Sequence, residues 1–120
     1  MASVANQIIQ KRHPTMLVNN AGVVTGKKLI NCSIPEIERL ILGLKYITVS
    51  LCRTIKVNVL GHFYLIKAFL PGLIQQKSGH ILSVASVMGL TGAAYAVDYC
   101  ASKFAVTGYM EALRQELVGT

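Results

Sequence analysis

Two short apolar segments, each followed by a polar turn and a helical pattern, constrain the fold of this chain more than any other feature. "TMLVNNAG" predicts a strand over 15–18, and "GHILSVAS" predicts a second buried strand over 79–85. Apolar residues recur at helical spacing over 53–76 and over 99–117, and we expect Pro71 to kink or shorten the first helix. Strands that alternate with helices form parallel β-α-β units, so the chain predicts an α/β fold.

The remaining segments are an N-terminal helix and one region that does not follow this pattern. Residues 3–12 predict a helix, and the capping box Ser33-x-x-Glu36 predicts the start of another. "LILGLKYITVSLCR", over 40–53, has a strand-like centre where that second helix should continue. With 120 residues the chain has room for one small domain. We interpret 1–120 as one incomplete domain and 40–53 as an atypical insertion within it.

The composition excludes a disordered chain and argues against a nucleic-acid partner. Hydrophobic residues make up 52% of the sequence and charged residues 14%, which favours a buried core. The net charge is +7, but the positive residues are scattered and no basic run is interleaved with aromatic residues. We therefore expect no nucleic acid among the partners. A weak attraction to anionic membranes or to phosphate-bearing cofactors stays open.

Cysteine usage and hydropathy bear on the cellular compartment. Three cysteines without a CxxC pair indicate a reducing, intracellular setting, and no two cysteines or histidines have zinc-ligand spacing, so we expect no metal site. The N-terminus lacks the hydrophobic core of a signal peptide. Residues 78–97 contain no Asp, Glu, Lys or Arg, but glycines and polar residues interrupt them. We interpret this run as strand and loop rather than a membrane span.

The segment "VDYCASKFAVTGYMEALRQEL" carries a tyrosine and a lysine one helical turn apart. Tyr99 and Lys103 are four residues apart and so share one face of the helix. A free tyrosine, with a pKa of about 10, is a poor base at neutral pH, and a nearby cation favours its phenolate. Such a pair can pass a proton to or from an alcohol or carbonyl oxygen, and Ser86 at the second strand's end can hold that oxygen. On its own, this spacing is also typical of an ordinary surface contact.

Four motifs, taken in order, resemble those of the short-chain dehydrogenase/reductase family. They are "NNAG" at 19–22, Asn58 in "VNVLGHF", Ser86 in "ILSVAS" and Tyr99 in "YCASK". The wording of "VNNAGVVTGKK" and "DYCASKFA" is most similar to the 16C group, which includes epidermal retinol dehydrogenase-like and 17-beta-hydroxysteroid dehydrogenase-like proteins. The resemblance implies a partial Rossmann-like fold, the central part of a doubly wound parallel sheet with the first and last strands missing.

The resemblance also implies roles for individual side chains. Tyr99 would be the acid/base, and Ser86 would bind and orient the substrate oxygen. Lys103 would assist Tyr99 and hold the nicotinamide ribose, while Asn58 would anchor a water that links Lys103 to solvent. Independently of the resemblance, Asn58 predicts a buried hydrogen bond to the backbone, which is compatible with that role. The cofactor would be NAD or NADP, and the residues expected to contact it are Asn19, Ala21, Gly22, Tyr99 and Lys103.

Parts of the family's cofactor site are not found in this sequence. The glycine-rich turn TGxxxGxG is absent, and "GVVTGKK" is no P-loop, because only three residues separate Gly22 from Gly26 and Lys28 stands where Ser or Thr would bind magnesium. The 16C group suggests the endoplasmic reticulum membrane or a lipid droplet as location, although its apolar anchor is not found either.

Together these features predict an oxidoreductase by descent. Its substrate would be a lipophilic alcohol or ketone, a retinoid or a steroid, and we expect the fragment itself to be inactive. The alternative is a catalytically silent fragment that forms homodimers or heterodimers with related subunits through the helices that carry Asn58 and Tyr99.

Overall fold

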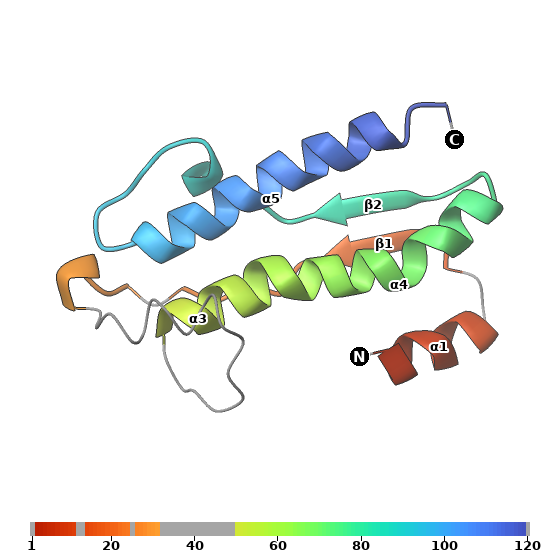
Figure 1. The fold of residues 1–120 in the computed structure, drawn as a ribbon, viewed down its shortest axis with the longest axis horizontal. Coiled ribbons are helices and arrows are strands. Elements are labelled where there is room, and N and C mark those ends of the chain that lie inside the picture. The colour runs from red at the N-terminus through yellow and green to blue at the C-terminus, as the bar shows by residue number, and fades with distance from the viewer. Residues whose placement is uncertain (1, 12–13, 25, 32–49, 120) are drawn as a thin grey trace.

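The computed structural model of the protein describes residues 2–11, 14–24, 26–31 and 50–119. In chain order these residues form α1 (Ala2–Lys11), β1 (Met16–Asn19), a 3₁₀ turn (Leu29–Asn31), α3 (Ser50–Ile55), a π-helical turn (Lys56–Leu60), α4 (Gly61–Gln75), β2 (His80–Ser83), a second 3₁₀ turn (Val87–Gly89) and α5 (Val97–Glu116) (Figure 1). The predicted helices over 3–12, 53–76 and 99–117 are thus confirmed, with ends shifted by a few residues.

The two strands form a parallel pair, as the alternation of strands and helices predicted. Met16 lies opposite His80, and Asn19 lies opposite Ser83. The chain reaches the start of β2 through α4, which is the crossover that parallel strands require. Both strands therefore end at the same edge of the sheet.

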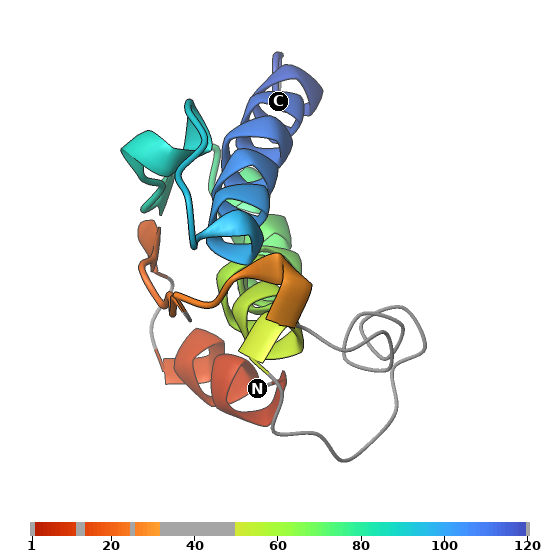
Figure 2. The ribbon, with the colours of Figure 1, turned by 90° about the vertical axis from the view of Figure 1, so that its left-hand side faces the viewer.

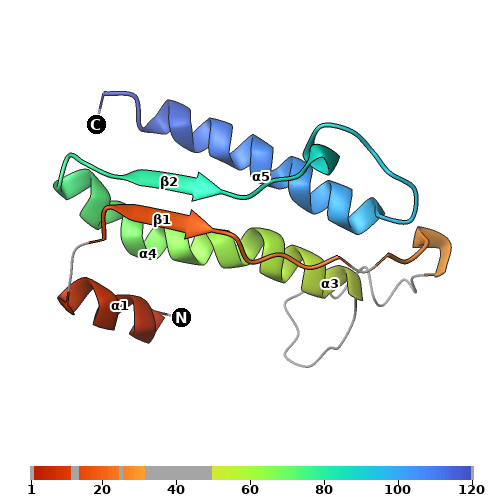
Figure 3. The same ribbon diagram turned by 180° about the vertical axis from the view of Figure 1, so that it is seen from behind.

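Among the described residues, helices cover one face of this sheet and leave the other bare. The sheet lies behind α4 and α5 in Figure 1 and in front of them in Figure 3, where it faces the viewer. Leu17 and Ile81 point to the helices and are partly buried, whereas Met16, Val18 and Leu82 are 60%, 48% and 54% exposed. The expectation of a fully buried second strand was wrong in this respect, because the described helices that pack on the sheet, α4 and α5, cover only one of its faces.

Helix α4 supplies most of the core. Ile66, Phe69 and Leu73 are buried at helical spacing beneath the sheet, and Val106 of α5 is 1% exposed beside them. The end-on view in Figure 2 shows α4 between α5 and α1, which packs against it. Pro71 was expected to kink or shorten the helix; it lies inside α4 and the helix continues to Gln75, so it does not end the helix. A proline removes one backbone donor, and the packing of both adjacent turns offsets that loss.

The unusual segment over 40–53 falls mostly outside the described residues, as does the capping box Ser33-x-x-Glu36. Its last four residues, from Ser50 onward, begin α3, so the strand-like interpretation is wrong for residues 50–52, while Arg53 is helical as predicted. Residues 50–53 directly precede the apolar helical pattern over 53–76, and the first turn of the helix extends back into them.

One helix of the described chain, Arg53–Gln75, is long and apolar enough to cross a membrane by length and composition. It also has the features of a core helix. Buried apolar side chains line one stripe of it, and Thr54, Asn58 and His62 are buried with hydrogen-bond partners on other elements. A core helix of a globular domain passes the same test of length and composition.

Candidate active site

The polar residues of the candidate site gather where β1 and β2 end. The Val84 amide donates to the Asn19 carbonyl at 2.8 Å, which continues the pairing past the last strand residues. The Asn19 side chain is 1% exposed, and its Nδ2 donates to Ser83 Oγ at 3.4 Å. Its Oδ1 is the one buried side-chain oxygen in the described residues without a hydrogen-bond partner. Asn19 thus joins the two strand ends from the helix-covered side.

Asn58 fastens the segment after "NNAG" to the long helix. Its Oδ1 accepts from the Val23 amide at 2.7 Å, and its Nδ2 donates to the Val23 carbonyl at 2.9 Å, so the side chain pairs with a backbone as a neighbouring strand would. Nδ2 also donates to Ser102 Oγ at 3.0 Å, and the residue has no solvent exposure. The predicted buried hydrogen bond of Asn58 to the backbone is therefore confirmed.

The helix is locally π-helical at this point. The Gly61 amide donates to the Lys56 carbonyl, five residues back instead of four. Such single π turns insert one extra residue, rotate the side chains that follow, and occur frequently at functional sites. Here the turn lies between Thr54 and His62, and Asn58 sits within it.

Lys103 is buried at the centre of the cluster. Its side chain is 3% exposed, and Nζ donates to the Val84 carbonyl at 2.7 Å. A Cβ added to Gly22 would lie 3.6 Å from this Nζ and 3.5 Å from Asn58 Oδ1, so these three residues adjoin one another. Burial lowers the pKa of Lys103, because the charged ammonium loses water that a single carbonyl replaces only in part.

Tyr99 and Ser86 lie at the rim of the cluster. Lys103 Nζ is 5.6 Å from the centre of the Tyr99 ring, within the range of a cation–π interaction, so the i, i+4 pair shares one face as predicted. Ser86 Oγ accepts from the Met88 amide at 3.2 Å and caps the turn that follows. Within the described residues the two hydroxyls have no hydrogen bond to each other.

Gly89 allows the Ser86 turn to press against α5. A Cβ at this position would lie 2.8 Å from the Lys103 carbonyl oxygen, a distance that real Cβ atoms do not show. Only glycine permits this approach. Ser86 is therefore held against the helix segment that carries Tyr99 and Lys103.

Two buried polar pairs were missed by the sequence reasoning. Thr54 Oγ1 in α3 donates to Asp98 Oδ2 in the first turn of α5 at 2.7 Å, and both residues are buried. His62, 1% exposed, contacts the Tyr109 hydroxyl through Nδ1 at 2.7 Å. The sequence does contain a signal for these contacts. Thr54, Asn58 and His62 follow one another at intervals of four in an otherwise apolar helix, which places three polar side chains on one face.

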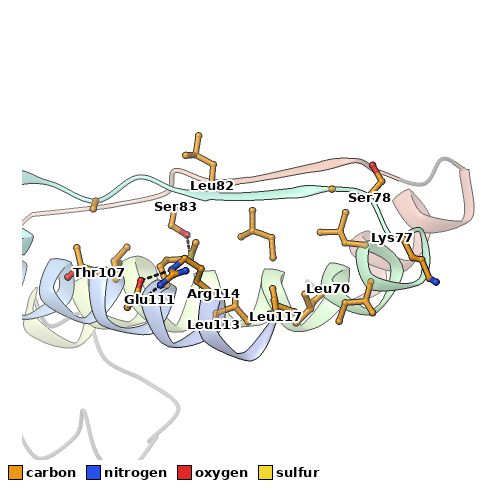
Figure 4. A pocket seen from close by; sticks show the side chains of 17 residues that line it. Leu70, Lys77, Ser78, Leu82, Ser83, Thr107, Glu111, Leu113, Arg114 and Leu117 are labelled. Atoms are coloured by element: carbon orange, nitrogen blue, oxygen red, sulfur yellow. Dashed lines mark hydrogen bonds and ion pairs between the residues drawn. The ribbon is translucent and has the colours of Figure 1, made fainter. Parts of the chain in front are cut away.

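A cavity in the described structure lies away from these residues. It has a volume of about 700 Å³ and opens between β2, the end of α4 and the second half of α5 (Figure 4). Leu70, Leu113 and Leu117 line it, with the Glu111–Arg114 ion pair at one side. None of the seven predicted site residues contributes to its wall, so we do not assign it to the reaction.

Comparison with known proteins decides the family. Residues 1–120 match the family described as short chain dehydrogenase. The chain belongs to this family. It is 45% identical over 103 residues to retinol dehydrogenase 10 of Homo sapiens, covering 86% of this chain and 26% of that protein. It is 38% identical over 115 residues to short-chain dehydrogenase/reductase family 16C member 6 of Bos taurus, covering 95% of this chain and 32% of that protein. The resemblance to the 16C group is thereby confirmed.

Solved structures of the family share the fold. A putative NAD(P)-dependent gluconate 5-dehydrogenase from Beutenbergia cavernae, with bound NADP, superposes with a TM-score of 0.80 at 28% identity, over 98% of this chain and 42% of that one. A metagenomic short-chain oxidoreductase in complex with NADP gives 0.78 at 30% identity, over 97% and 47%. The Rossmann-like assignment is confirmed, as is NAD or NADP as the family's cofactor. The chain spans about a quarter to a third of its curated relatives and under half of these structures.

The residues of this chain fit one half of such a cofactor. Ala21 and Gly22 are exposed at the end of β1, and Gly22 borders Lys103, whose Nζ carries further N–H donors beyond the one given to Val84. These groups suit the hydroxyls of a ribose. The sequence has no glycine-rich turn to offer backbone amides to a pyrophosphate.

Proposed function

We propose that this chain carries the catalytic centre of an oxidoreductase that interconverts an alcohol and a carbonyl on a retinoid or a steroid with NAD or NADP. The observation that supports this most is the burial of Lys103, whose Nζ lies between the Val84 carbonyl, Gly22 and the Tyr99 ring. A buried lysine that has no carboxylate partner among the described residues is costly, so its position points to a role. Relatives named retinol dehydrogenase 10 support a retinoid as substrate.

Tyr99 would move the proton in this reaction. The Lys103 ammonium lies 5.6 Å from the centre of its ring, so the cation and the phenol share one face of α5. In the oxidative direction the phenolate would accept the proton of the alcohol, and in the reductive direction the phenol would return it. The cofactor, when bound, would accept or supply the hydride.

Ser86 would hold the substrate oxygen. Its Oγ already accepts from the Met88 amide, so its own hydroxyl hydrogen is available to a substrate oxygen. The turn that Gly89 presses onto α5 fixes the position of this hydroxyl relative to the Tyr99–Lys103 face. Asn58 would act at a distance, by holding Val23 and Ser102 in place behind Lys103.

The test of this proposal uses a chimera. The flanks of retinol dehydrogenase 10 would be joined to this chain, and the segment over 40–53 shortened to match that relative. Lys103→Ala should then lower both the turnover of retinol and the affinity for NAD or NADP, because one ammonium serves both. An unchanged cofactor affinity in Lys103→Ala would contradict the assignment of Lys103.

A second candidate function is association with related subunits, without catalysis by this chain. Large aromatic side chains on the outer faces of the two long helices favour it, since Tyr64 of α4 is 58% exposed and Phe104 of α5 is 47% exposed. Sedimentation of the chain alone, and mixed with a full-length relative, tests this. We expect a dimer that Tyr64→Glu and Phe104→Glu disrupt. If the chain sediments as a monomer both alone and in the mixture, this candidate function is overturned.

We also propose an intracellular, membrane-associated location. The net charge of +7 and the exposed apolar residues of the sheet's bare face support adhesion to an anionic bilayer. Flotation with vesicles that contain phosphatidylserine should carry the chain upward at low salt. Equal flotation with neutral vesicles would contradict an electrostatic contribution.

A further inference from the structure

A line of hydrogen bonds runs beneath the strand ends and connects both strands with the two long helices. Tyr109 of α5 stands at its centre, 2.7 Å from His62 Nδ1 and 3.1 Å from Ser83 Oγ. At one end Ser83 accepts from Asn19 Nδ2 at 3.4 Å, and at the other His62 Nε2 is 3.1 Å from the Ala21 carbonyl oxygen. The line therefore joins β1, β2, α4 and α5 to the "NNAG" turn.

The chemistry of its ends fixes the direction of every bond. The Ala21 carbonyl can only accept, so His62 Nε2 carries the proton. In a neutral imidazole Nδ1 must then accept, and the Tyr109 hydroxyl donates to it. Tyr109 has no second proton, so the bond between the two hydroxyls uses the Ser83 hydrogen, and Ser83 in turn accepts from the amide of Asn19. Met110 Sδ, 3.2 Å from Ser83 Oγ, is a second and weaker acceptor for the same hydrogen.

We propose that His62 is a positioning residue that holds the Ala21 carbonyl, and with it the "NNAG" turn, through the Nε2–H tautomer that the Tyr109 hydroxyl supports. The peptide held in this way leads directly into Gly22, which adjoins Lys103 and Asn58. Its effect on cofactor binding rests on the proposed function, whereas the tautomer and the contact with Ala21 do not.

The surroundings keep His62 neutral. Burial lowers the pKa of His62, the bond to Ala21 opposes this in part, and the Lys103 charge on α5 lowers it further. Tyr109, also on α5, is the other titratable group that faces the ring, and burial raises its pKa. As the pH falls through about 6.5, His62 takes up a proton in the unfolded chain before it does so in the folded chain. The folded state therefore loses stability below that pH.

A plain core-filling role makes a different prediction about substitutions. Leucine fills much of the ring's volume but has no donor, whereas glutamine places an amide nitrogen near the position of Nε2. If His62 only fills space, the two variants should behave alike. If it holds Ala21, His62→Gln should restore the contact and His62→Leu should lose it.

The sequence offers an unusually clean probe of this contact. Ala21–Gly22 is the one Ala–Gly pair in the chain, so labelling alanine carbonyls with ¹³C and glycine amides with ¹⁵N gives a single carbonyl–amide cross peak. We expect His62→Leu to move the Ala21 carbonyl resonance upfield, as loss of a donor does, and His62→Gln to stay near the unmodified chain. Equal shifts in both variants would overturn the proposal.

A second measurement needs no substitution and remains available if a variant does not fold. In ¹⁵N-histidine spectra of the unmodified chain, His62 should show a protonated Nε2 and an unprotonated Nδ1, and its titration should lie below pH 6.5, the ordinary value for a free histidine. An Nδ1–H tautomer, or titration near 6.5, would overturn the assignment. Because neither experiment uses cofactor or substrate, failure here is distinguishable from failure of the proposed function.

Discussion

Replacing Asn58 with alanine removes three hydrogen bonds at one point of the fold. The Val23 amide loses the acceptor that lies 2.7 Å away, and the Val23 carbonyl and Ser102 Oγ lose their donor. Asn58 is fully buried, and water does not readily replace these partners. A donor left unsatisfied in such a place costs about 1–3 kcal/mol.

Hydrogen exchange at the Val23 amide measures this cost directly. A loss of 1–3 kcal/mol predicts faster exchange by about 5- to 150-fold in Asn58→Ala, since about 1.4 kcal/mol corresponds to a factor of ten. The amide of Cys100, which donates to the Ala96 carbonyl in α5, serves as an internal reference. Asn20→Ala, at an exposed neighbour in the same turn, serves as the matched control and should leave Val23 unchanged.

The pattern of exchange separates a local from a global effect. Faster exchange at Val23 with little change at Cys100 is the expected result. Unchanged exchange at Val23 in Asn58→Ala would refute the idea that Asn58 holds this segment. An equal increase at both amides would show that Asn58 stabilises the whole fold rather than this one attachment.

Three further predictions follow from particular contacts. In urea titrations, Gly89→Ala should destabilise the fold by about 1–3 kcal/mol, because the new Cβ would lie 2.8 Å from the Lys103 carbonyl oxygen. Gly108→Ala in α5, where a Cβ would meet open space, should instead stabilise the fold by about 0.5–1 kcal/mol. Equal effects of the two substitutions would contradict the close approach at Gly89. Burial lowers the pKa of Lys103 in the folded chain below its ordinary value of 10.5, so between the folded and the unfolded pKa the unfolded chain binds more protons. The free energy of unfolding should therefore rise with pH in that range more steeply than in Lys103→Met. Parallel plots of unfolding free energy against pH for the two proteins would contradict this. Calorimetry should find NADH binding to the chain no tighter than about 1 mM, since no glycine-rich turn holds the pyrophosphate, and micromolar binding would contradict it.

Much of the fold was predictable because its signals are local. The helical rhythm over 99–117 and the strand over 15–18 each reside in one continuous segment, and alternation of the two types predicts parallel pairing. The π turn around Asn58 was not predicted, because one inserted residue barely disturbs a pattern with intervals of three and four. Which strand residues are exposed, such as Met16 and Leu82, does not follow from the sequence, since an apolar strand does not reveal which of its faces will be covered.

The candidate site shows the same division. Tyr99 and Lys103 are one turn apart on a single helix, so their proximity follows from the sequence. His62 and Tyr109 are 47 residues apart, and each taken alone fits an ordinary helix position. Their contact depends on how α4 and α5 cross beneath the sheet, which no local pattern encodes. The interval of four that links Thr54, Asn58 and His62 was the available clue to a polar stripe.

The most direct test of the account is the role of Tyr99. In the chimera with retinol dehydrogenase 10 flanks, Tyr99→Phe should abolish retinol oxidation. Cofactor affinity should remain nearly intact, because the phenylalanine ring packs as the tyrosine ring does beside Lys103. If the chimera folds and binds cofactor, and Tyr99→Phe keeps substantial retinol oxidation, then Tyr99 is not the acid/base and the proposed catalytic centre is wrong.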